Sequence, residues 1–178
     1  MDLLERKRLF EFMGRDFLVW LWFKSETNGG RFDLNEIGIV DLLLDNKIIL
    51  QSESTVYEEE QVETVTCTGN NPDLKEARFA LAENKKIIQV MVKISQGDNE
   101  WSLVLDSTWM NFKNFKTPKV MQDDNDDKEG LFYEKMYLIN QALTIMNAVF
   151  HSFIKLRISS EWNSKELQAL NKWIFEGR

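Results

Sequence analysis

Residues 85–105, KKIIQVMVKISQGDNEWSLVL, decide the predicted fold of this chain. Apolar and polar side chains alternate on both sides of a central turn sequence, which is the pattern of two half-buried strands. The turn sequence Gly97-Asp98-Asn99 accommodates positive φ angles at little cost. These residues therefore predict a β-hairpin, which is the basic unit of an antiparallel sheet.

Further strand patterns lie around this hairpin. Residues 31–54 contain apolar runs on either side of Asp45-Asn46, and this pair predicts a second hairpin turn. Residues 62–68 alternate with the period of a strand, and the apolar positions of residues 73–84 predict a short helix.

Helical patterns occupy both ends of the chain. Apolar side chains at helical spacing predict one helix over residues 2–26, ended by the glycines of residues 28–30. Residues 131–158 predict a long helix, and a second helix follows from Ser160. We therefore expect a single α+β domain over residues 1–178, in which an antiparallel sheet of hairpins carries the N-terminal and C-terminal helices on one face.

The apolar positions of these elements predict the core. Side chains in the apolar phase of a helix or strand face the interior of the protein. We expect the following residues to be buried: Trp20, Leu21, Ile88, Val90, Val92, Leu103, Leu143 and Phe150.

Composition excludes most enzyme mechanisms. The chain has 22 Lys+Arg, 29 Asp+Glu, one His and one Cys among 178 residues. Cys67 alone forms no internal disulfide or zinc site, and His151 has no partner motif for a triad or a metal pair. We therefore expect no catalytic residue, no metal, no cofactor and no small-molecule substrate. The longest apolar stretch, residues 17–23, is far shorter than the ~20 residues that span a bilayer, so we expect a cytoplasmic protein without membrane contact.

Residues 123–130, DDNDDKEG, share only part of the pattern of a calcium-binding loop. Such a loop has alternating oxygen ligands, a glycine at its sixth position and a glutamate at its twelfth. Counted from Asp123, the sixth position is Lys128, so the required glycine is missing. We interpret this stretch as a solvated acidic loop that could contact a basic partner.

Residues 109–119, WMNFKNFKTPK, interleave aromatic and lysine side chains in a less regular pattern and contain no acidic residue. Ammonium groups neutralise phosphates and flat rings stack on bases, so this composition suits a nucleic-acid contact. The same string arises when the aromatic residues face the core and the lysines face water. A net charge of −7 confines any DNA contact to a local basic face. The candidate DNA-binding residues are Lys113, Lys116 and Lys119, with Lys85 and Lys86.

Several strings also resemble a known family. Residues 17–26, FLVWLWFKSE, then residues 64–81 running into 85–94, and then residues 101–105 are similar to the C-terminal half of the recombination-associated RdgC proteins. The resemblance covers residues 17–157. It implies an acidic, nucleoid-associated bacterial protein that forms ring-shaped dimers, binds duplex DNA without marked sequence preference and restrains RecA-driven strand exchange.

Two functions remain open at this point. The first is a non-catalytic, sequence-independent DNA-binding protein of recombination or nucleoid-associated type, located in the cytoplasm at the nucleoid. The second is an acidic protein-protein interaction module, of mobile-element origin, that never touches DNA. Trp162, Trp173 and Phe175 add more apolar surface than a short terminal helix needs, so we expect a homodimer or larger homo-oligomer.

Overall fold

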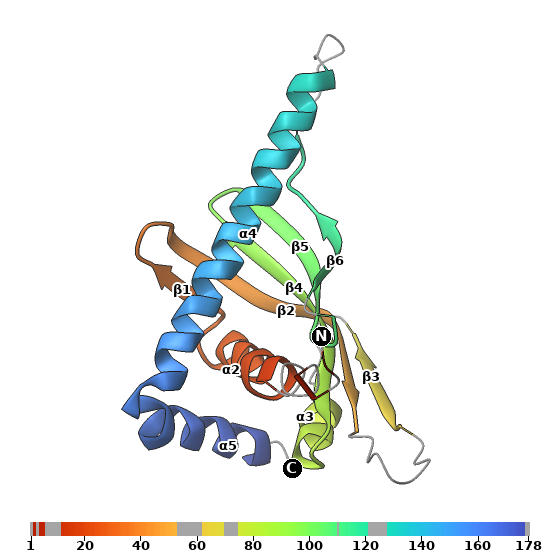
Figure 1. Cartoon of the computed structure of the whole chain (residues 1–178), viewed down its shortest axis with the longest axis vertical. Helices are drawn as coiled ribbons and strands as arrows, with labels where there is room; N and C mark the ends of the chain where they lie inside the picture. Colours follow the sequence, from red (N-terminus) through yellow and green to blue (C-terminus); the bar gives the residue numbers. More distant parts are fainter. Residues whose placement is uncertain are drawn as a thin grey trace.

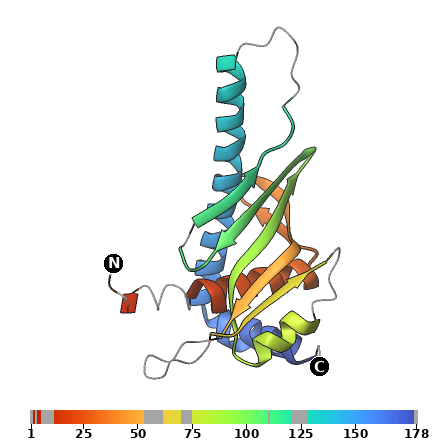
Figure 2. The same cartoon turned by 90° about the vertical axis from the view of Figure 1, so that its right-hand side faces the viewer.

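The computed structural model describes residues 2, 4–5, 12–52, 62–69, 75–109, 111–120 and 128–176. Within these residues an antiparallel sheet of six strands carries helices on one face, so the predicted α+β class is confirmed (Figure 1, Figure 2). The elements in chain order are η1 (Phe12–Phe17), α2 (Leu18–Thr27), β1 (Arg31–Leu34), β2 (Gly38–Gln51), β3 (Thr64–Thr68), α3 (Lys75–Ala82), β4 (Lys86–Gln96), β5 (Asn99–Asp106), β6 (Asn111–Lys116), α4 (Lys128–Ile158), η2 (Trp162–Glu166) and α5 (Leu167–Glu176).

The strand β2 is the centre of the sheet. It is 14 residues long and pairs along one edge with β4. Its other edge is shared by β1, which pairs with its first half, and β3, which pairs with its second half. The remaining strands follow in the order β4-β5-β6, so β6 forms the far edge of the sheet among the described strands.

The hairpin turn predicted at Asp45-Asn46 is wrong. The chain continues through these residues as one strand, with a register shift between Asp45 and Ile48 that marks a β-bulge. Ile48 is buried opposite Val90, so pairing with β4 extends across the polar dipeptide. The turn lies earlier, between β1 and β2, and it ends at Gly38, whose φ is 89°.

The hairpin of β4 and β5, the strand β3 and the helix α3 confirm the predictions for residues 85–105, 62–68 and 73–84. In the turn between β4 and β5, Gly97 has a φ of 58°. The less regular residues 109–119 contain the strand β6. A bulge opposite Ser102 and Val104, and a φ of 51° at Asn114, break the alternation in this strand.

The helices α2, α4 and α5 lie on one face of the sheet, while α3 packs beside α5 at one end (Figure 2). In the predicted N-terminal helix, the described residues from Phe12 onward are helical, and residues 6–11 lie outside the described residues. The residues of α2 from Leu18 to Phe23 are all buried. The predicted C-terminal helical hairpin is confirmed by α4 and α5.

One hydrophobic cluster contains the buried residues of every helix and of most strands. The buried residues of α4 form its sheet-facing stripe, and they are Leu138, Ala142, Ile145, Met146, Val149 and Phe153. Of the predicted core residues, Trp20, Leu21, Val90, Val92 and Leu103 are buried and Ile88 and Phe150 are half-buried, whereas Leu143 is 37% exposed. The prediction for Leu143 is wrong because this side chain lies outside the sheet-facing stripe.

The sequence predicts self-association because Trp162, Trp173 and Phe175 add surplus apolar surface. This reason is wrong for the two tryptophans. Trp162 and Trp173 are buried in their own chain. The indole Nε1 of Trp173 donates a hydrogen bond of 2.9 Å to Glu26 at the end of α2, and Trp22 donates another of 2.7 Å to the same carboxylate. These rings join α5 to α2, and only Phe175 remains exposed.

Candidate nucleic-acid interface

The sheet has one face that the helices leave uncovered. Trp101 of β5 donates an indole hydrogen bond of 2.9 Å to the carbonyl oxygen of Leu138 in α4, which fixes the side of β5 that the helices cover. Successive side chains of a strand point to opposite faces. Ser102, Val104 and Asp106 therefore belong to the uncovered face.

Lys113 lies on this face, but its charge is already paired. It is the cross-strand neighbour of Val104, and its Nζ forms an ion pair with Asp106 Oδ2. Asp106 is only 3% exposed. Lys113 is therefore both a cation of the predicted interface and the counter-ion of a buried carboxylate.

The remaining partners of Asp106 hold the turn that leads into β6. Gln89 Nε2 donates to Oδ2 at 3.0 Å, and the backbone N–H groups of Thr108 and Trp109 donate to Oδ1 at 2.9 and 3.1 Å. Burial raises the pKa of this carboxyl, but the hydrogen bonds from Lys113, the Trp109 N–H and Gln89, together with the lysine charge, outweigh it and hold the pKa below its ordinary value.

Lys116 and Lys119 are the exposed cations of this edge. Lys116 pairs in register with Ser102 at the end of β6, and Lys119 follows three residues later. In the described part of the chain, no ion pair occupies either ammonium group. Both positions are therefore open to a phosphate from outside.

The structure does not bring Lys85 and Lys86 to this surface. Lys86 is 1% exposed, so its ammonium group cannot meet the phosphate backbone of a duplex, and its prediction as a DNA contact is wrong. Lys85 lies just before β4, and its Nζ is 2.9 Å from Glu63 Oε2. Its hydrogen bond and charge lower the pKa of the Glu63 carboxyl.

The aromatic residues and the lysines of β6 point to opposite faces. Phe112 pairs with Leu105, a residue of the helix-covered face, and it lines an apolar cavity of about 270 Å³ beside α4. Phe115 is half-buried against the core, while Trp109 and Phe112 remain exposed. The alternative interpretation of this stretch, in which the aromatic residues face the core and the lysines face water, therefore agrees with the orientation of these side chains in β6. Bases cannot stack on Phe112 while Lys116 binds a phosphate from the same side.

Lys93 is a member of the uncovered face that the sequence analysis did not select. It is the cross-strand neighbour of Ser102, with Lys116 on the other side of that serine. Its Nζ is 3.8 Å from Asp45 Oδ2 and 3.7 Å from Glu100 Oε1. The sequence contains a signal for this position, because Lys93 lies between the apolar residues Val92 and Ile94 and alternation in a strand puts it on the opposite face.

Two residues with reactive side chains, Cys67 and His151, lie on β3 and α4. Burial, with a contribution from Glu76, raises the pKa of the Cys67 thiol and so disfavours the reactive thiolate. His151 is exposed on α4. The described residues contain no cluster of three or more His, Cys, Asp or Glu side chains that could hold a metal ion. Residues 121–127 of the acidic loop lie outside the described residues.

No protein-family model matches this chain, and no curated protein matches it either. Among the described helices, none combines the length and the apolar character that crossing a membrane requires.

Proposed function

We propose that this chain is a non-catalytic, sequence-independent DNA-binding protein of recombination or nucleoid-associated type, as its resemblance to the RdgC proteins implies. The observation that carries the proposal is the exposure of Lys116, at the end of the edge strand β6, and of Lys119, in the segment that follows it, within a stretch that contains no acidic residue. Lysine contacts to phosphates position a protein on a duplex without reading its sequence, which is what sequence-independent binding requires. This function places the protein in the cytoplasm, at the nucleoid.

Lys113 has a positioning role in this proposal. A phosphate contact would require its ammonium group to leave the buried carboxylate of Asp106, and a buried unpaired charge is costly. Lys113 instead holds Asp106, which in turn binds the turn before β6. The phosphate contacts are therefore assigned to Lys116 and Lys119.

The test is the double variant Lys116→Gln/Lys119→Gln, which removes two charges without touching the buried ion pair. It should weaken binding to duplexes of unrelated sequence by the same factor, because phosphate contacts carry no sequence information. The matched control is Lys155→Gln/Lys165→Gln, which removes two exposed charges from α4 and η2.

Fluorescence anisotropy with labelled duplexes measures both variants. Equal loss of affinity in the control and in the double variant would mean that only the net charge matters and that the edge of the sheet is not the site. A loss confined to one duplex sequence would contradict sequence independence.

A second candidate function, a protein-protein interaction module, is favoured by the charge balance of the uncovered face. Lys93 lies between Asp45 and Glu100, and Lys113 pairs with Asp106. The same sheet also exposes the apolar side chains of Ile39 and Leu43 on β2. A mixed surface of this kind suits a protein partner. Absence of duplex binding by the parent protein at about 50 mM salt would favour this function.

A further inference from the structure

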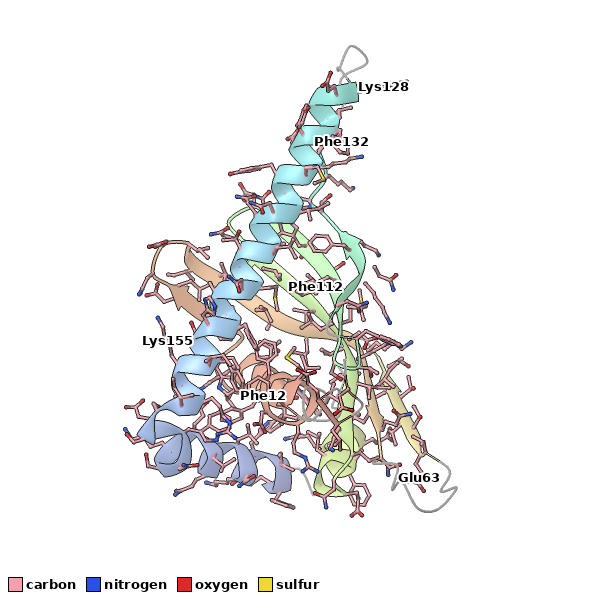
Figure 3. All side chains as sticks on the ribbon, in the orientation of Figure 1. Phe12, Glu63, Phe112, Lys128, Phe132 and Lys155 are labelled. Atoms are coloured by element: carbon pink, nitrogen blue, oxygen red, sulfur yellow. The ribbon has the colours of Figure 1, made fainter. Side chains whose placement is uncertain are left out.

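The N-terminal half of α4 extends beyond the sheet and presents large apolar side chains to solvent (Figure 1, Figure 3). The exposed residues are Phe132, Tyr133, Met136, Tyr137 and Leu143. Together such side chains form a patch on the order of several hundred Å², which is the size of the largest apolar patches on monomeric proteins, and such patches often serve a function.

The apolar residues on this side of α4 follow a heptad repeat. Their spacing alternates between four and three residues along the whole run, which we call the α4 seam: Phe132, Met136, Ile139, Leu143, Met146 and Phe150. A repeat of 3.5 residues is the pattern by which one helix packs against another helix. Leu138 and Ala142 of the sheet-facing stripe lie outside this run, whereas Met146 and Phe150 at its C-terminal end pack in the protein's own core. The part of the α4 seam that is free for a partner therefore runs from Phe132 to Leu143.

Exposure along the α4 seam falls from one end to the other. Phe132 is 59% exposed, Met136 is 49% exposed, and Met146 is 3% exposed. The buried end of the seam leads into the apolar cavity of about 270 Å³, which Leu143, Met146 and Phe150 line together with Phe112. A projecting ring and an apolar cavity therefore lie on the same side of the same helix.

This arrangement is self-complementary. In an antiparallel pair of α4 helices, Met136 of one copy faces Ile139 of the other, and Phe132 then faces Leu143 at the mouth of the cavity. A two-fold axis repeats this contact in both directions, as an isologous interface requires. Each copy would cover the exposed ring of the other.

The charge of the α4 seam also fits a second copy. From Met136 to Phe150, α4 contains no Asp, Glu, Lys or Arg. Two copies with a net charge of −7 each can therefore meet along this segment without local repulsion. A strongly charged partner such as DNA finds no counter-charge there.

We propose that the α4 seam binds a second copy of this chain, through an antiparallel pairing of the projecting halves of α4 about a two-fold axis. The pairing does not depend on the proposed DNA contact, because Lys116 and Lys119 are not part of the seam. Loss of dimerisation and loss of DNA binding are therefore separate results.

Sedimentation of the full chain at about 50 μM tests the pairing. The parent should sediment at twice its mass of 21.0 kDa. Met136→Glu/Leu143→Glu places two charges in the seam and should give a monomer. The matched control, Tyr137→Glu/Thr144→Glu, adds the same charges at the same spacing on exposed positions outside the seam and should remain a dimer. Circular dichroism checks that both variants are folded.

Disulfide cross-linking between variants that carry one cysteine each, made in a chain in which Cys67→Ala removes the native cysteine, tests the antiparallel direction. A mixture of Phe132→Cys and Leu143→Cys should form the mixed cross-link, because these positions face each other across the axis. A monomeric parent, a dimeric seam variant or a monomeric control would overturn the proposal. So would cross-linking of each variant with itself in place of the mixed product, since that indicates parallel helices.

Discussion

The ion pair between Asp106 and Lys113 gives different roles to lysines that are alike in the sequence. Lys113, Lys116 and Lys119 recur at every third position, but only Lys113 meets a buried carboxylate. The side chain of Asp106 also caps the turn at Thr108 and Trp109. A single residue thus links the start of β6 to the stability of the sheet.

Lys113→Ala should lower the free energy of unfolding by about 1–3 kcal/mol, because it leaves a buried acceptor without its charged partner. Lys116→Ala, at an exposed position of the same strand, should change it by less than about 0.5 kcal/mol. Urea unfolding monitored by tryptophan fluorescence measures both values. Equal stability of the two variants would contradict the assigned role of Lys113.

The pKa of Asp106 adds a pH dependence to the same comparison. Its folded-state pKa lies below the ordinary value of 3.8, so the ionised carboxylate stabilises the fold above that pH. This stabilisation is lost as the pH falls through the folded-state pKa. Removal of Lys113 raises that pKa, so the acid-unfolding midpoint of Lys113→Ala should move to higher pH than that of the parent. An unchanged midpoint would show that the ion pair does not control the carboxyl.

The sequence predicts elements whose residues carry a local pattern of turn or alternation. It does not predict features that depend on which strands pair with each other. The turn at Gly97 and the alternation around it suffice for the hairpin of β4 and β5. At Asp45-Asn46 the local chemistry favours a turn, but β4 offers partners on both sides, so β2 continues through a bulge. The stretch that forms β6 was predicted only as a less regular segment, because Asn114 interrupts its alternation.

The junction between α2 and β1 depends on one glycine. Gly30 has a φ of 68°, and a Cβ at this position would collide with the carbonyl oxygen of Leu42 on β2. Gly29 has a φ of 58°, but its Cβ would meet nothing within 4 Å. The two positions share backbone strain and differ only in the space around them.

Gly30→Ala should therefore destabilise the protein more than Gly29→Ala does. Both substitutions lower the free energy of unfolding by about 1–2 kcal/mol, because alanine is strained in a left-handed backbone. Gly30→Ala lowers it by about 1–3 kcal/mol more, because its Cβ collides with Leu42. Thermal and urea unfolding of the two variants give the comparison. Equal costs would mean that the approach of Leu42 does not constrain this turn.

For the whole molecule, the sequence predicted more of the fold than of the site. Lys116 and Lys119 lie on the surface as expected, because a lysine without a partner stays in water. The burial of Lys86 was not predictable, since a lysine at a strand end has the same local pattern whether or not tertiary packing covers it. The prediction of Leu143 as a core residue is wrong because sheet packing and helix pairing use the same three- and four-residue spacings.

The proposed DNA contact and the proposed self-association use different residues of the molecule. The helix α4 lies on one side of the sheet and leaves the other side uncovered (Figure 2). The DNA contact is assigned to Lys116 and Lys119, which we call the lysine edge, and the self-association to the α4 seam. A dimer joined through α4 would contain two lysine edges. Two edges in one dimer increase the affinity for a long duplex, because the second contact forms at high effective concentration.

The salt dependence of duplex binding tests the central claim, phosphate contact by the lysine edge, most directly. The affinity of the parent for a short duplex should fall linearly on a log–log scale between about 50 and 200 mM salt. Lys116→Gln/Lys119→Gln should reduce that slope by about 1.8 for each protein bound, because each lost phosphate contact removes about 0.9. Lys155→Gln/Lys165→Gln should keep the parent's slope. A parent that shows no duplex binding at about 50 mM salt, or a double variant whose slope equals that of the parent, would contradict the assignment.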